Sequence, residues 1–68
     1  MQPHQQRVVD EKSELDAKIL ALSNFVSTSM TFVALNHKDQ DLLTMQLHTM
    51  RDYSRTLGLR IERFDLMT

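Results

Sequence analysis

The sequence has no cysteine and no tryptophan, and its 68 residues include one glycine and one proline. Without cysteine the chain can form neither a disulfide nor a thiolate metal site. So little glycine and proline excludes an all-β domain, because each β-hairpin needs turn residues. The apolar runs are too short to cross a membrane, and the start of the chain, MQPHQQR, lacks the apolar segment of a secretory signal. We therefore expect one small, soluble, cytoplasmic domain that is mainly helical.

Neither sign of charge is in excess. Eight Lys and Arg oppose nine Asp and Glu, which gives a formal net charge of −1. This balance produces no general attraction to nucleic acid, so DNA binding is not expected. Hydrophobic residues at 41% and charged residues at 25% are typical of a globular chain rather than a disordered one.

Apolar residues recur at helical spacing from the start of the chain. Gaps of four and three residues alternate, which is typical of a helix that packs at a small angle on another helix. Pro3 suits the first turn of such a helix, where its missing N–H needs no partner. The pattern predicts a helix over about residues 3–26, with its stripe at Val8, Lys12, Leu15, Ile19, Leu22 and Val26.

Residues 27–36 are expected to connect this helix to a second one. The hydroxyl residues from Ser27 to Ser29 favour a helix end, because their side chains compete for backbone groups. Phe32 and Leu35 are predicted to cover the end of the core from one short helical turn. Asn36, followed three residues later by Asp39, is typical of a helix start.

A second and longer stripe follows the connection with the same alternation of gaps. It predicts a helix over about residues 37–64, after which residues 65–68 fray. Ser54 is the polar member of this stripe, and Gly58 lies inside the helix, where glycine costs about 1 kcal/mol relative to alanine. The stripe consists of Leu43, Leu47, Met50, Ser54, Leu57, Ile61 and Phe64.

Two helices with so short a connection are most simply an antiparallel hairpin. When the two stripes face each other, Lys12 lies opposite Leu57. A lysine in that position either sets the register or extends its ammonium group toward an anion. The other predicted neighbours are Leu22 with Leu47, Ile19 with Met50 and Leu15 with Ser54 on the seam, and Glu11 with Arg60, Asp16 with Arg51 and Lys18 with Tyr53 on its flanks.

A lone hairpin of this size has little interior. Chains this short without disulfides or metals normally need additional burial from oligomerisation. We therefore predict an all-α fold in which antiparallel two-helix hairpins assemble into a homo-oligomeric helical bundle. Ser54 and Gly58 would let another backbone or a flat ligand approach closely. Apolar residues outside the stripes supply surface for assembly: Val9, Leu20, Leu42, Met45 and Leu59.

The sequence offers no arrangement of residues for catalysis. His4, His37 and His48 do not have metal-ligand spacing. The chain contains no glycine-rich phosphate loop and no nucleophile motif. We therefore expect a protein that is not an enzyme and that uses no cofactor.

The second predicted helix carries four arginines and no lysine after residue 50. Arginine is favoured for bidentate phosphate recognition and for stacking on bases, and Tyr53 is the best candidate for base stacking. Each arginine also has a purely structural interpretation. Arg51 and Arg60 would be salt-bridge partners, and Arg55 and Arg63 would form a solvated helix face whose positive charge interacts favourably with the negative C-terminal end of the helix.

Several segments resemble a family of short phage and prophage α-hairpin proteins. These are QQRVVDEKSELDAKI, the F-x-x-L from Phe32 to Leu35, and LLTMQLHTMRDYSRTLGLRI. The last segment matches the family pattern LL-x-x-QL-x-x-M-x-x-Y-x-x-x-L-x-x-RI from Leu42 to Ile61. In size and hairpin plan the chain also resembles, more distantly, the phage anti-CBASS and anti-Thoeris sponge proteins.

The resemblance to sponge proteins implies a helical oligomer with ligand pockets between subunits, lined by an aromatic residue and basic side chains. It implies sequestration of a cyclic oligonucleotide or an ADP-ribose-derived immune signal without cleavage. No ligand residue is carried over from those proteins. From side-chain chemistry we predict stacking on Tyr53 and phosphate contacts from Lys18, Arg55, Arg60, Lys12 and Arg51.

Two other functions remain open from the sequence. The chain would act as a protein-binding regulator if it docked a host or phage protein through Leu42, Met45 and Leu59. It would alternatively bind RNA as a hairpin dimer, like the plasmid copy-number repressor Rop. The sparse basic face and the pI of about 6.2 argue against RNA.

Overall fold

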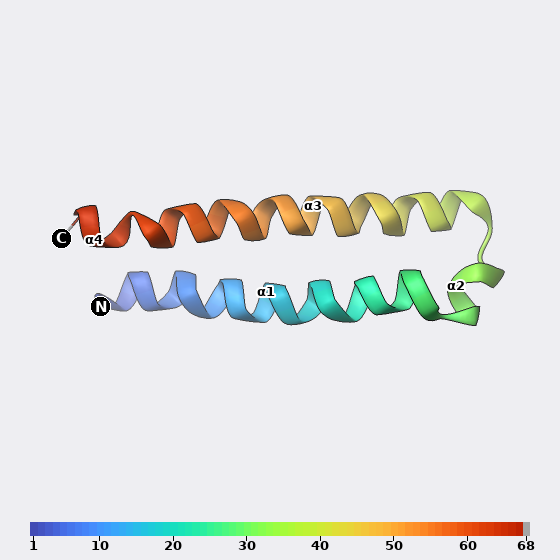
Figure 1. Ribbon diagram of the computed structural model, residues 1–68, viewed down its shortest axis with the longest axis horizontal. Coiled ribbons are helices and arrows are strands. Elements are labelled where there is room, and N and C mark those ends of the chain that lie inside the picture. The colour runs from blue at the N-terminus through green and yellow to red at the C-terminus, as the bar shows by residue number, and fades with distance from the viewer. Residues whose placement is uncertain (68) are drawn as a thin grey trace.

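The computed structural model describes residues 1–67, with the side chains of residues 1–65. Two long helices, α1 (Pro3–Thr28) and α3 (His37–Glu62), run antiparallel and are joined by the short helix α2 (Met30–Ala34) (Figure 1). A last short helix, α4 (Phe64–Met67), follows α3. The hairpin is a rod of 50 × 15 × 14 Å. The expected all-helical chain with a long antiparallel helix pair is confirmed for the described residues.

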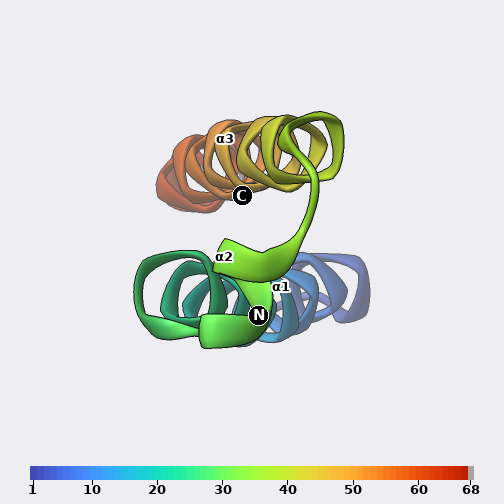
Figure 2. The same cartoon turned by 90° about the vertical axis from the view of Figure 1, so that its right-hand side faces the viewer.

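The two ends of the rod differ. The chain turns from α1 to α3 at one end, here called the closed end, and both termini lie at the other, the open end (Figure 1). Seen from the closed end, α2 covers the end of α1 (Figure 2). The segment expected to fray forms α4 as far as Met67, and Thr68 lies outside the described residues.

The first long helix starts where Pro3 predicts, because proline occupies its first turn. The Gln5 side chain accepts a hydrogen bond of 2.9 Å from the backbone N–H of Gln2. The same helix ends two residues later than expected. The hydroxyl groups of Ser27 and Thr28 donate backward to helix carbonyls, at 2.7 and 2.6 Å, so they prolong the helix instead of ending it.

Side chains fix the path of the connection. The Ser29 hydroxyl accepts hydrogen bonds from the first turn of α2 and so caps that helix. Phe32 packs edge-to-face on Phe25, with ring centroids 5.9 Å apart. The Gln40 amide of α3 donates to the carbonyl groups of Phe32, Val33 and Leu35 at 3.0, 3.1 and 3.2 Å. The helix turn and the position of Phe32 agree with the sequence-based expectation.

Asn36 caps α3, as its sequence signal predicts. Its side-chain oxygen accepts a 2.9 Å hydrogen bond from the backbone N–H of Asp39. From this cap α3 continues without a break through Gly58 to Glu62.

The interior of the hairpin is small. Among the described residues, the buried hydrophobic side chains are Val8, Leu47 and Leu57. Leu57 is the one that is completely enclosed. The other apolar members of the stripes are only half-buried between α1 and α3. The fold therefore positions two helix flanks beside a narrow seam rather than around a deep core.

Candidate ligand-binding surface

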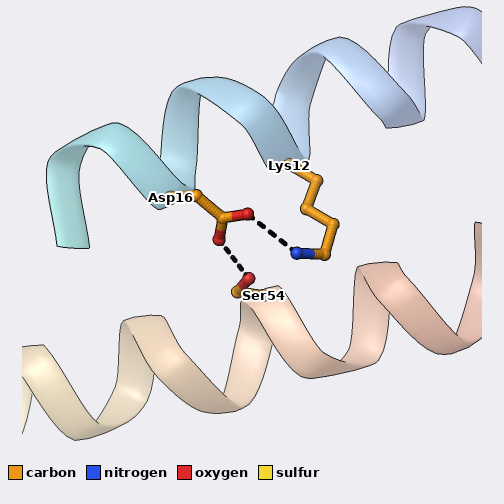
Figure 3. A network of polar contacts seen from close by, with 3 residues as sticks. All are labelled: Lys12, Asp16 and Ser54. Atoms are coloured by element: carbon orange, nitrogen blue, oxygen red, sulfur yellow. Dashed lines mark hydrogen bonds and ion pairs between the residues drawn. The ribbon is translucent and has the colours of Figure 1, made fainter. Parts of the chain in front are cut away.

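A polar network crosses the seam near the middle of the rod (Figure 3). Within α1, the Lys12 ammonium group donates to one carboxylate oxygen of Asp16 at 2.8 Å. From α3, the Ser54 hydroxyl donates to the other carboxylate oxygen. Asp16 thus joins a lysine of its own helix to a buried serine of the facing helix. The polar member of the α3 stripe is satisfied inside the hairpin.

This network lowers the pKa of the Asp16 carboxyl group. The main cause is the hydrogen bond from Lys12, and the bond from Ser54 acts in the same direction. Both donors favour the ionised carboxylate. Asp16 therefore keeps its negative charge at neutral pH.

Lys12 also fills the space beside Gly58. A methyl group added at Gly58 would lie 3.2 Å from Lys12 Cε, so the lysine stem occupies the place of the missing side chain. The idea that Ser54 and Gly58 form an open notch for another backbone or a flat ligand is therefore wrong. Both residues face α1, and Lys12 lies beside Gly58, the next residue after its expected neighbour, Leu57.

Arg51 does not bond Asp16, and that predicted ion pair is wrong. Asp16 is taken by Lys12 and Ser54 instead. Arg51 donates a 3.2 Å hydrogen bond to the Ser23 hydroxyl, which lies about two helical turns from Asp16 toward the closed end. Because serine is neutral, the charge of the Arg51 guanidinium group is left without a bonded carboxylate.

Tyr53 bonds Glu11 rather than Lys18. The Tyr53 hydroxyl donates to the Glu11 carboxylate across the seam, and about half of its side chain remains exposed. The hydrogen bond to Glu11 is the main reason that the pKa of Tyr53 is raised, with desolvation second; Arg60 opposes the rise. The predicted neighbours Lys18 and Tyr53 make no aromatic contact in the described part of the chain, and Glu11 forms no ion pair with Arg60 there.

The predicted ligand residues do not form a single site on one hairpin. Tyr53 and Arg60 are two helical turns apart and share a flank of α3. Arg51 and Arg55 are one turn apart and lie on the other flank, because two residues rotate a helix by about 200°. Lys12 lies between the flanks and is paired. Lys18, Arg55 and Arg60 are exposed and form no ion pair with any described residue.

Sequence reasoning missed the roles of Glu11, Asp16 and Ser54. Two signals were present. Lys12 and Asp16 are opposite charges four residues apart on a helix, a spacing that favours a pair. Ser54 is a polar residue in an apolar stripe, and such a residue needs a partner once it is buried.

Two further properties bear on what this surface can bind. Within residues 1–67, no three His, Asp or Glu side chains come together as a metal site would require. No helix in that range is both long and apolar enough to span a membrane.

Comparison with known proteins gives two matches. Residues 2–63 match the sequence model of the Sequestin family. The chain is also 38% identical over 64 residues to the "Uncharacterized 7.5 kDa protein in denB-rIIB intergenic region" of Enterobacteria phage T4, an alignment that covers 94% of this chain and 98% of that protein. No solved structure matches significantly. The expected relationship to short phage proteins is confirmed.

Proposed function

The chain belongs to the Sequestin family, and from this premise we propose that it sequesters a small signalling molecule without altering it chemically. The ligand that its residues suit best is a cyclic oligonucleotide or an ADP-ribose-type immune signal, and the place of action is the cytoplasm of an infected host cell. The family name points to sequestration, and the similarity to a phage protein supports a role during infection.

The observation that carries this proposal is the set of cations without carboxylate partners. Lys18, Arg55 and Arg60 are exposed and form no ion pair with a described residue. Arginine binds phosphate through two parallel hydrogen bonds, whereas a surface lysine acts as a point charge. Tyr53 adds a half-exposed ring on the flank of α3 that it shares with Arg60. The hairpin therefore carries the two kinds of contact that a nucleotide needs: cations for its phosphates and an aromatic face for its base.

The division of these cations between two flanks favours a site shared by copies of the hairpin. One rod presents Tyr53 and Arg60 on one flank and Arg51 and Arg55 on the other, so no flank alone surrounds a ligand. A two-fold interface presents every residue twice. Two copies then supply an aromatic ring and a cation each, which suits a cyclic dinucleotide with two bases and two phosphates. The proposal accordingly includes a homo-oligomer.

Binding without catalysis is the mode that the polar groups support. The buried hydroxyl of Ser54 donates to Asp16, a carboxylate whose charge is already shared with Lys12. A serine nucleophile instead requires an adjacent base that is free to accept its proton. The network of Figure 3 therefore holds the two helices together rather than activating a reactive group.

Isothermal titration calorimetry of the purified protein against cyclic di- and trinucleotides and cyclic ADP-ribose isomers tests this function. We expect at least one member of the panel to bind more tightly than about 10 μM and to be recovered unchanged. Arg55→Gln and Tyr53→Ala should weaken that binding, while Arg7→Gln, a matched change of an exposed arginine near the open end, should not. Absence of binding across the panel would remove the sponge function.

A second candidate is a regulator that docks a host or phage protein. Leu42, Met45 and Leu59, which the sequence singles out for this role, remain exposed on the single hairpin. If the ligand panel fails and these side chains stay accessible to solvent in the assembled protein, the docking function becomes the better explanation. If assembly covers Leu42 and Met45, the docking function loses most of its binding surface.

A further inference from the structure

Charge is distributed unevenly along the rod. The half near the closed end comprises residues 19–50, namely the second half of α1, all of α2 and the first half of α3. No Asp, Glu, Lys or Arg occurs between Lys18 and Lys38, and none occurs from Leu42 to Met50. Depletion of charge is the feature that marks the centre of a protein interface against the rest of a surface. Apart from Lys38, Asp39 and Asp41 in the first turns of α3, the closed-end half therefore has the charge-poor composition of an interface.

The same half carries most of the exposed hydrophobic side chains. Met30 and Val33 of α2 are 81% and 66% exposed, and Met45 at the start of α3 is 61% exposed. Figure 2 shows this end of the rod, where α2 lies in front of the long helices. Of the eight large hydrophobic residues that are exposed in the described chain, five lie in this half: Leu20, Met30, Val33, Leu42 and Met45.

The solvent-accessible surface of the hairpin is larger than that of a compact protein of the same mass. The hairpin exposes 5281 Å², whereas a compact globular protein of this mass exposes about 4450 Å². The excess, about 800 Å², equals what each partner buries in an interface of standard size. Each copy of the folded chain has the same excess of exposed surface. Two identical copies that pack on each other therefore bury the excess of both.

We propose that the closed-end half is the surface through which two copies of this chain pack, helices against helices, with Val33 and Met45 near the centre of the contact. This inference specifies the assembly part of the proposed function and does not depend on the ligand. Overlap of the two closed-end halves leaves the charged halves projecting on either side. Arg51 and Tyr53, which follow directly after residue 50, then lie at the rim of the contact, where a shared ligand site would open.

Sedimentation equilibrium of the full chain tests the surface. Val33→Glu combined with Met45→Glu places two carboxylates in the proposed contact and should raise the dimer dissociation constant about tenfold or more. Leu59→Glu is the control, since Leu59, like Met45, is an exposed hydrophobic residue of α3 but lies in the charged half. It should leave dimerisation within about twofold of the wild type. Circular dichroism shows whether each variant remains helical.

Single-cysteine probes give an independent measurement, because the chain contains no cysteine of its own. A short bis-maleimide should join two Met45→Cys chains covalently and leave Leu59→Cys without a covalent cross-link. Cross-linking of Leu59→Cys alone, or dimers that are insensitive to the paired glutamates, would overturn the surface assigned here while leaving sequestration possible. A wild-type chain that is monomeric at micromolar concentration would overturn both the surface and the shared site. Dimers of the expected kind without ligand binding would overturn sequestration alone.

Discussion

Ser54 in α3 donates its hydroxyl hydrogen to the carboxylate of Asp16 in α1, and this bond satisfies the buried polar side chain of α3. Around it, the seam is mostly apolar and half-buried. A hydrogen bond inside an apolar seam stabilises one register of the two helices over the others, because a shifted register would bury the hydroxyl without a partner.

Replacing Ser54 with alanine should destabilise the hairpin by about 1 kcal/mol. The substitution removes a buried donor that has a charged acceptor, without enlarging the side chain. Urea unfolding followed by circular dichroism, at one fixed protein concentration, measures the change. Ser13→Ala is the control, since Ser13 is exposed on α1, and a Ser54→Ala variant no less stable than this control would contradict the role of the bond.

The Asp16 network predicts a loss of stability in acid. The folded-state pKa of Asp16 lies below its ordinary value of 3.8, so its contribution is present above the unfolded value and is lost as the pH falls through the lower folded value. The midpoint temperature of thermal unfolding should therefore decrease when the pH is lowered below about 4. In Asp16→Asn this part of the fall should be absent; an unchanged acid profile in that variant would show that other carboxylates cause it.

Tyr53 should titrate above the ordinary pKa of tyrosine. The neutral hydroxyl donates to Glu11, and the nearby carboxylate opposes formation of a second negative charge. Near-ultraviolet absorbance reports this ionisation without interference, since the chain has a single tyrosine and no tryptophan. Glu11→Gln should move the pKa of Tyr53 downward, and identical titrations of the two proteins would mean that the bond is absent in solution.

Gly58→Ala should stabilise the hairpin by up to about 1 kcal/mol. Alanine removes the cost of glycine inside a helix, and its methyl group meets only the stem of Lys12, which can move by a few tenths of an ångström. A larger residue should be harmful, so Gly58→Leu serves as the opposing control. Urea unfolding curves of the variants and the wild type measure the change. An alanine variant less stable than the wild type would mean that the Lys12 side chain cannot move aside.

The helix starts and the seam follow from the sequence because their causes are local. The helix ends do not: α1 ends two residues later than predicted, at Thr28, and α3 two residues earlier, at Glu62. Asn36 carries its own capping oxygen, and Pro3 its own constraint on the first turn. Ser27 and Thr28 were misjudged, since a hydroxyl can end a helix or bond backward into it, and local sequence does not decide which. The choice depends on where the chain goes next.

The flank contacts were harder to predict, because each depends on the reach of a side chain and not only on register. Asp16 had two candidate cations, one on its own helix and one across the seam, and the nearer Lys12 bonds it. Tyr53 bonds Glu11 instead of its predicted neighbour Lys18, through a hydroxyl at the far end of a rigid ring. Position in the helix predicts which residues compete for a partner, but not which of them forms the bond.

The amide of Gln40 has a consequence for the evolution of this chain. One side chain of α3 binds the carbonyl groups of Phe32, Val33 and Leu35, so the spacing between the long helices is set at the reversal as well as along their length. Relatives that insert or delete a residue there would have to replace this amide or accept a shifted pairing of the whole hairpin. Loop length should consequently vary less among functional relatives than the outward-facing residues of either long helix.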